Sequence, residues 1–179
     1  MKKDRAILVD ICWTLFYSNT TYDFLHIRGN KFNSLIYTLF GVDLVRSRAI
    51  RAFNHLPVDE QQAQVEWFYT NYLLPRKIAP VWQMVEGQNI VLVSQTMEII
   101  AKTVAQHIGA KTYYATQHKE EVLTRYTDFD IITDNISDLA LIRHAKQATI
   151  ITYNNRSRWE KILPLDTNVR FIDTGRNKY

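Results

Sequence analysis

The stretch AILVDICWTLF, residues 6–16, decides the fold that the chain is expected to adopt. Its first four residues form a continuous apolar run, and Asp10 follows that run directly. An unbroken apolar run of this length is typical of a strand that is covered on both faces of a sheet. In an open parallel sheet, ligands bind beyond the carboxyl ends of the strands, so Asp10 is predicted to lie where a ligand would bind.

Further apolar runs have the same character, and helical patterns separate them. The predicted strands lie at 89–94, 112–115, 129–133, 148–152 and 169–172. The predicted helices cover 97–108, with Gly109 as the C-terminal stop, 122–126 and 136–145. This alternation predicts an α/β fold with a doubly wound, Rossmann-like parallel sheet.

Residues 17–86 interrupt the alternation, because they contain helical patterns at 22–28, 32–40, 44–54 and 60–74 but no convincing strand. We therefore expect a helical cap at 17–86, inserted into a core that consists of residues 1–16 and 87–179. A run of aromatic residues in the cap is expected to pack in the cap's own interior: Trp67, Phe68, Tyr69 and Tyr72.

Composition limits the classes of protein to which the chain can belong. The chain has 179 residues, of which 46% are apolar, which suits one or two domains. Its formal charge of +4 comes from scattered Lys and Arg without a nucleic-acid-binding motif, so no nucleic acid partner is expected. Arg46, Arg48 and Arg51 form a loose basic facet, which could contact an anionic substrate but is more often a solvated face. The N-terminal apolar run is too short to span a bilayer, and the single cysteine excludes an intramolecular disulfide, so a cytoplasmic protein without a membrane partner is expected.

Several polar residues stand at the ends of the predicted strands. A single polar residue at such a position is more often a helix cap or a turn residue, but several together indicate a functional site. Asp10 and Asp134 follow two strands that can be neighbours, and the repulsion between two close carboxylates is usually relieved by a divalent cation, here Mg²⁺. Ser94 precedes a helix, whose N-terminus favours an anion, and Lys119 supplies a fixed positive charge. Together with Thr14, these residues are the equipment for phosphoryl transfer through an aspartyl-phosphate.

The same residues resemble the motifs of the haloacid dehalogenase (HAD) superfamily. Residues 7–16 resemble its first motif, an apolar strand followed by D-x-D-x-T-[LV]. Ser94 is similar to the second motif, Lys119 to the third, and Asp134 with Asp138 to the fourth, an Asp-x-x-x-Asp after an apolar strand. The helical insertion between the first and second motifs resembles the phosphoserine phosphatase-like branch.

The resemblance implies that Asp10 is the nucleophile that attacks phosphorus. It also implies that Asp10, Asp134 and the backbone carbonyl of Cys12 hold Mg²⁺, and that Asp138 orients this metal site. The order of the motifs differs from that of response-regulator receivers, which carry the acidic pair on the first strand and the phospho-acceptor Asp in mid-chain.

The resemblance implies a small phosphorylated substrate as the partner of the site. Thr14 and Ser94 would bond the phosphoryl oxygens, and Lys119 would offset their charge. Only residues 95–118 separate Ser94 from Lys119, a shorter stretch than in the phosphoserine phosphatases, so their substrate preference is not transferred.

Three positions depart from the family pattern. Cys12 stands where family phosphatases carry a second Asp, which protonates the leaving oxygen and later activates water. A thiol with an ordinary pKa near 8.5 is a poor acid for an alkoxide and a poor base towards water. Trp13 and Thr133 replace smaller residues and are expected to narrow the pocket.

Three functions are therefore compatible with the sequence. The first is a magnesium-dependent phosphatase or phosphotransferase, which the retained motif residues favour. The second is a catalytically weak HAD-fold protein that binds a metal, an anionic ligand or a protein partner, which Cys12 favours. The third is cleavage of a carbon–heteroatom bond through an Asp10 ester, but such enzymes do not need the pair of metal-binding carboxylates.

Overall fold

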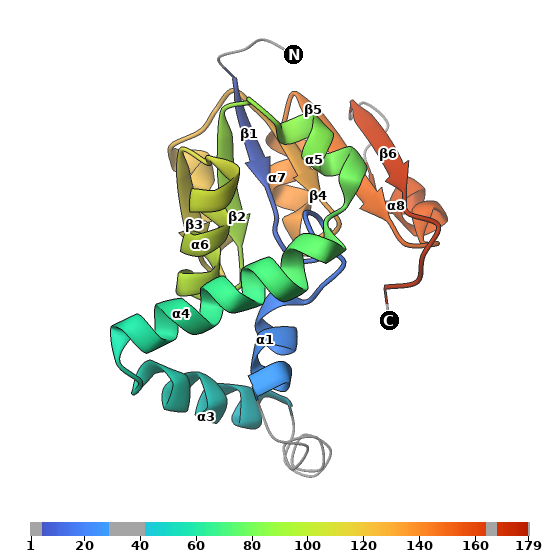
Figure 1. Cartoon of the computed structure of the whole chain (residues 1–179). Helices are drawn as coiled ribbons and strands as arrows, with labels where there is room; N and C mark the ends of the chain where they lie inside the picture. The colour runs from blue at the N-terminus through green and yellow to red at the C-terminus, as the bar shows by residue number, and fades with distance from the viewer. Residues whose placement is uncertain (1–4, 29–41, 164–167, 179) are drawn as a thin grey trace.

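The structure is a computed structural model that describes residues 5–28, 42–163 and 168–178. Its centre is a six-stranded parallel sheet with the strand order β3-β2-β1-β4-β5-β6 (Figure 1). The strands are β1 (Ala6–Val9), β2 (Ile90–Ser94), β3 (Thr112–Ala115), β4 (Phe129–Thr133), β5 (Gln147–Thr152) and β6 (Val169–Asp173). This order confirms the predicted doubly wound, Rossmann-like sheet.

The first strand occupies the middle of the sheet. Ile7 pairs with Ile90 of β2 on one side and with Asp130 of β4 on the other. The chain builds the sheet outward from β1 in both directions, so the strand order reverses between β1 and β4. The carboxyl ends of strands at such a reversal form a crevice where ligands bind in doubly wound folds.

Helices cover both faces of the sheet. One face packs its apolar side chains against α5 (Ala79–Val85) and α6 (Glu98–Ile108), and the opposite face packs against α7 (Leu139–His144) and α8 (Arg156–Ile162). Because both faces are covered, nearly every residue of β1, β2, β4 and β5 is buried, whereas the four residues of β3 are half-buried. Within the described ranges, no helix has the length and apolar character needed to cross a membrane.

One predicted helix end is confirmed and other predicted helices need correction. Gly109 ends α6 with φ at +68°, as predicted. The segment predicted as a helix at 122–126 is instead a 3₁₀ helix, η3 (Lys119–Thr124), which closes when the N–H groups of residues 125 and 126 both donate to the carbonyl of Val122. The predicted helix at 136–145 begins with a 3₁₀ turn, η4 (Ile136–Asp138), before α7. The helices α5 and α8 were not predicted.

The segment between β1 and β2 is helical where the structure describes it. It contains α1 (Thr20–Arg28), α3 (Val42–Asn54) and α4 (Val58–Phe68), which continues through the π turn η1 (Tyr69–Leu73) and the 3₁₀ turn η2 (Leu74–Arg76). Figure 1 shows α1, α3 and α4 beyond the carboxyl ends of the central strands. The predicted helix at 32–40 lies outside the described residues.

These helices share one apolar cluster with the sheet. Phe24, Phe53 and Phe68 belong to the same buried cluster as Ile7 of β1 and Leu92 of β2. Phe24 of α1 packs edge-on against Phe53 of α3 and Phe68 of α4, so the apolar packing among these helices is continuous with that of the sheet. The division into a core at 1–16 and 87–179 and a cap at 17–86 stays a prediction.

One part of the aromatic run was predicted wrongly. Phe68 and Tyr69 are buried and Tyr72 is half-buried, but Trp67 is 55% exposed. The buried residues Val65, Phe68, Tyr69 and Leu73 follow the spacing of three and four residues that marks one face of a helix. Trp67 falls outside this spacing.

Candidate functional site

A polar cavity of about 170 Å³ lies at the carboxyl ends of β1, β2 and β4, at the point where the strand order reverses. Its lining includes five of the predicted site residues: Asp10, Cys12, Ser94, Lys119 and Asp134. It also includes Trp13, which was expected to narrow the pocket. The remaining lining residues were not predicted for the site: Asn19, Thr21, Arg46, Gln95, Asn135 and Lys178. Thr14 and Asp138 are fully buried and contact the carboxylate or ammonium groups of this lining.

Lys119 connects two of the predicted carboxylates. Its Nζ atom lies 3.0 Å from Oδ2 of Asp10 and 3.0 Å from Oδ2 of Asp138, and all three side chains are buried. Burial alone would lower the pKa of Lys119, but the charges of Asp10 and Asp138 outweigh it and raise the pKa. The lysine is therefore a fixed positive charge beside the predicted nucleophile.

Asp138 is held in place by the residue that was expected to narrow the pocket. The hydroxyl of Thr133 donates to Oδ2 of Asp138 at 2.6 Å and accepts from the N–H group of Asn135 at 3.1 Å. Thr133 is not part of the cavity lining, so the expectation that it narrows the pocket is wrong. Burial and the charge of Asp10 raise the pKa of Asp138, and Lys119 opposes this rise.

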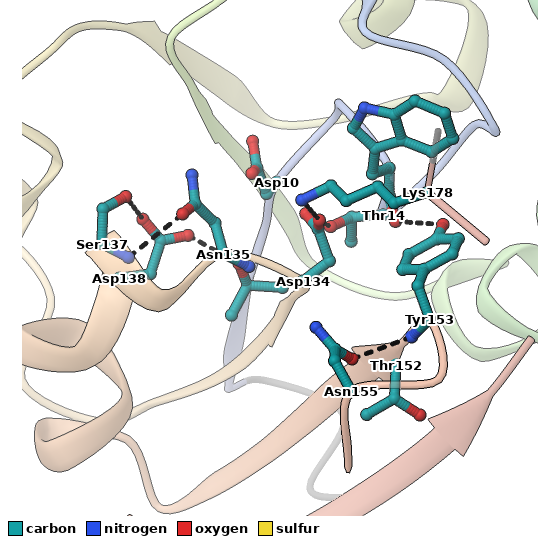
Figure 2. Close-up of polar contacts among 12 residues, drawn as sticks. Asp10, Thr14, Asp134, Asn135, Ser137, Asp138, Thr152, Tyr153, Asn155 and Lys178 are labelled. Carbon is teal, nitrogen blue, oxygen red and sulfur yellow. Dashed lines mark hydrogen bonds and ion pairs between the residues drawn. The ribbon is translucent and has the colours of Figure 1, made fainter. Parts of the chain in front are cut away.

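Asp134 has a partner at each of its carboxylate oxygens. Thr14 Oγ1 donates to Oδ1 at 3.1 Å, and the ammonium group of Lys178 forms an ion pair with Oδ2 (Figure 2). Although it is ion-paired, Oδ2 has no hydrogen bond of regular geometry and is fully buried. Burial, followed by the charge of Asp10, raises the pKa of Asp134 to about 6. Thr14 was predicted to bond a phosphoryl oxygen, but in this structure its hydroxyl is used by Asp134.

The donor set at the cavity can be tested against the predicted Mg²⁺. No group of three or more His, Cys, Asp or Glu in the described ranges is arranged to hold a metal ion. The predicted site needs only two carboxylates and a backbone carbonyl, because Mg²⁺ is commonly bound through one or two carboxylates together with waters and phosphate oxygens. Asp10 and Asp134 supply those carboxylates, and the charge of Asp10 contributes to the raised pKa of Asp134. The residues therefore fit a magnesium ion bound in part by the ligand.

Ser94 has a buried hydroxyl group for which the described residues supply no hydrogen-bond partner. Its side chain is only 1% exposed, it lines the cavity, and its Oγ has no hydrogen-bond partner in the described part of the chain. Buried hydroxyls without a partner are costly and usually bond a ligand or water. The helix that follows begins at Glu98 rather than directly after Ser94, and the N–H group of Met97 donates to Thr21 at 3.1 Å.

Cys12 is engaged in a chain of hydroxyl groups. Its Sγ lies 3.0 Å from Thr20 Oγ1, which lies 2.6 Å from Thr96 Oγ1, and Thr96 is also 3.0 Å from Thr21 Oγ1. Burial and the charge of Asp10 raise the pKa of Cys12 to about 11. The thiol is therefore neutral at physiological pH, and the hydroxyl chain ties the loop after β1 and the start of α1 to the loop after β2.

Trp13 adopts a backbone conformation that side chains other than glycine rarely adopt. Its φ is +56°, which is a left-handed conformation and is strained for a bulky residue. Tyr153 supports this conformation, because its hydroxyl donates to the Trp13 carbonyl at 2.6 Å and its ring packs edge-on against the indole at 5.6 Å. Trp13 also lines the cavity, as predicted.

Two cations in the lining were not predicted for the site. Arg46 of α3 is half-buried and lines the cavity, whereas Arg48 and Arg51 are exposed, so the expectation of a solvated facet is correct for only two of the three. Lys178 reaches the cavity from the segment after β6. No periodicity or motif in the sequence marks either residue.

Comparisons with known proteins support the fold alone. Neither a family model nor a curated protein matches the chain. Among solved structures, the chain is similar to a crystal structure of a protein with unknown function from Bordetella pertussis Tohama I, with a TM-score of 0.61 and 14% sequence identity. The match covers 94% of this chain and 98% of that chain, so the two share the architecture over nearly their whole length.

Proposed function

We propose that the chain is a HAD-like hydrolase, a magnesium-dependent phosphatase or phosphotransferase that acts on a small phosphorylated metabolite through an Asp10 aspartyl-phosphate. The observation that carries the proposal is the position of Lys119 Nζ, 3.0 Å from both Asp10 and Asp138 at the edge of a buried polar cavity. A carboxylate nucleophile beside a fixed cation is suited to a phosphoryl group, whose oxygens carry negative charge.

The hydroxyl of Ser94 supports an anionic ligand. It is buried, lines the same cavity and has no hydrogen-bond partner in the described residues, so a phosphoryl oxygen would satisfy it. A second cavity of about 480 Å³ shares Arg46 and Gln95 with the first. The smaller cavity suits a phosphoryl group, and the larger one suits the organic part of a small metabolite.

The charges of the site support a divalent cation. Three carboxylates, those of Asp10, Asp134 and Asp138, are matched by the ammonium groups of Lys119 and Lys178 and by Arg46 in the cavity lining. A phosphate ester adds negative charge that these three cations do not balance. Asp10, Asp134 and the backbone carbonyl of Cys12 would hold Mg²⁺, which when bound supplies positive charge that offsets the phosphoryl oxygens.

The proposed reaction has two covalent steps. The Asp10 carboxylate attacks phosphorus, the bond from phosphorus to the ester oxygen breaks, and the alcohol leaves with a proton taken from solvent, because Cys12 is a weak acid. Water then attacks the phosphorus, the bond from Asp10 to phosphorus breaks, and inorganic phosphate leaves. If another hydroxyl compound replaces water, the same step is a phosphotransfer.

A second candidate function follows from Cys12. The thiol has a raised pKa of about 11 and bonds with Thr20, so it is poorly suited to protonate a leaving group or to activate water. We therefore keep as the alternative a catalytically weak protein of the same fold that binds a metal, an anionic ligand or a protein partner. Loss of a general acid–base group typically lowers a rate by about 10²–10⁴-fold.

The deciding experiment measures hydrolysis of an aryl phosphate, whose leaving group needs little protonation. Wild-type turnover should be slow, and Cys12→Asp should raise it by at least about tenfold, a conservative share of the usual acid–base contribution. Asp10→Asn should abolish hydrolysis in both backgrounds. If Cys12→Asp is folded, binds Mg²⁺ and is still inert, the phosphatase proposal is wrong and the binding function replaces it.

A further inference from the structure

Lys178 places a positive charge at the carboxylate that is proposed to hold the metal. Its ammonium group forms an ion pair with Oδ2 of Asp134, whose side chain is only 2% exposed (Figure 2). The other carboxylate oxygen accepts from Thr14. Asp134 therefore has one oxygen for a cation, and Lys178 is at that oxygen.

The segment that carries Lys178 is fixed by contacts on both sides. The guanidinium group of Arg176 lies over the ring of Tyr17 at 4.3 Å, and the Oδ1 atom of Asn177 accepts from Asn154 at 2.8 Å. Gly175 begins this segment with φ at +62° and donates its N–H group to Asp173 at 3.0 Å. Residues 175–178 are therefore held against the loop after β1 and the loop after β5.

An ammonium group and a divalent cation compete for the same buried carboxylate oxygen, because their positive charges repel each other at short distance. If Lys178 stays in place, the metal loses a ligand, and if the metal binds, Lys178 must leave Asp134. Displacement of the ammonium group also removes a contact that holds residues 175–178.

We propose that Lys178 is a tethered counter-cation of Asp134, which a divalent cation must displace, so that metal binding releases residues 175–178 from the site. The proposal rests on the proposed magnesium site and adds a residue that sets its affinity. Lys178 keeps Asp134 paired when the metal is absent, and it makes occupancy of the site depend on the concentration of free divalent cation.

The test is a calorimetric titration of the full chain with Mg²⁺ alone, with no substrate. Lys178→Met should bind Mg²⁺ at least about tenfold more tightly than the wild type, because the competing charge is gone. Lys178→Arg keeps the charge and should stay within about threefold of the wild type. The matched control is Lys111→Met, which removes an exposed lysine next to the opposite end of the sheet and should leave the affinity unchanged. In the double variant Lys178→Met/Asp134→Asn, the gain in affinity should disappear.

A second measurement follows the segment itself. Hydrogen exchange of the Gly175 and Arg176 amides should become at least about tenfold faster when Mg²⁺ is added to the wild type, and it should already be fast in Lys178→Met. Mg²⁺ affinities that agree within threefold between the wild type and Lys178→Met, an absence of binding in both, or exchange that Mg²⁺ leaves unchanged would each overturn the proposal. Inactivity of Cys12→Asp towards aryl phosphates would instead count against the proposed phosphatase and leaves these two measurements unaffected.

Discussion

The Sγ atom of Cys12 lies 3.0 Å from the hydroxyl oxygen of Thr20, the first residue of α1. The thiol of Cys12 thus joins a chain of hydroxyl groups that runs from Thr20 of α1 to Thr96. Cys12 therefore links the loop after β1 to a helix of the inserted segment, whatever its part in a reaction.

The chemistry of this thiol gives the first prediction. The rise in the pKa of Cys12 to about 11 lowers its thiolate fraction at pH 8 by about two orders of magnitude. Iodoacetamide should therefore alkylate Cys12 in the folded chain at least about a hundredfold more slowly than in the urea-unfolded chain. Mass spectrometry of timed samples measures both rates, and folded-state alkylation within tenfold of the unfolded rate would contradict the burial and pairing described above.

Lys119 gives a prediction about stability. Lys119→Met leaves the buried carboxylates of Asp10 and Asp138 without their shared cation, and it should lower the free energy of unfolding by about 3–5 kcal/mol. The double variant Lys119→Met/Asp138→Asn removes one of the unpaired charges and should recover part of that loss. Urea unfolding measures all three chains. Lys111→Met is the control on an exposed lysine and should change stability by less than about 0.5 kcal/mol.

Asp134 gives a prediction about pH. Its pKa is raised from the ordinary 3.8 to about 6, so the folded chain holds a proton that the unfolded chain has lost between these pH values. The resulting stabilisation is fully present below about pH 4 and is lost as the pH rises through about 6. In a metal-free buffer with a chelator, the free energy of unfolding of the wild type should fall over this interval relative to Asp134→Asn, by up to about 3 kcal/mol. Parallel pH profiles for the two chains would show that Asp134 is not perturbed.

Tyr153 gives a prediction about the strained loop. Tyr153→Phe removes the hydroxyl that donates to the Trp13 carbonyl at 2.6 Å, and it should lower the free energy of unfolding by about 1–2 kcal/mol. The double variant Tyr153→Phe/Trp13→Gly should lose less than the sum of the two single variants, because glycine adopts a φ of +56° without strain. Tyr113→Phe on β3 is the matched control. Strict additivity would mean that the hydroxyl does not support the Trp13 conformation.

The sheet could be predicted from the sequence because both of its faces are covered. Burial on both sides makes the central strands β1, β2 and β4 mostly apolar, and that signal is local. The short helices α5 and α8 gave no comparable signal, because a helix of seven residues has too few turns to establish a periodic apolar face.

The candidate site could be predicted where its residues follow strands directly. Asp10, Ser94 and Asp134 meet because parallel strands end at the same edge of the sheet. Arg46 lies in α3 and Lys178 lies in the segment after β6. Both line the cavity only because tertiary packing brings these two segments next to it. The hydrogen bonds from Thr14 to Asp134 and from Thr133 to Asp138 likewise depend on distances that no local sequence pattern encodes.

The central position of β1 has a consequence for the order in which the protein folds. Residues 6–9 are synthesised early, but one of their two neighbouring strands is β4 at 129–133, so one edge of this apolar strand has no neighbour in the chain until most of it has left the ribosome. An unpaired apolar edge is a template for pairing with other chains. Formation of the cavity must therefore wait for long-range pairing, which forms more slowly than local contacts.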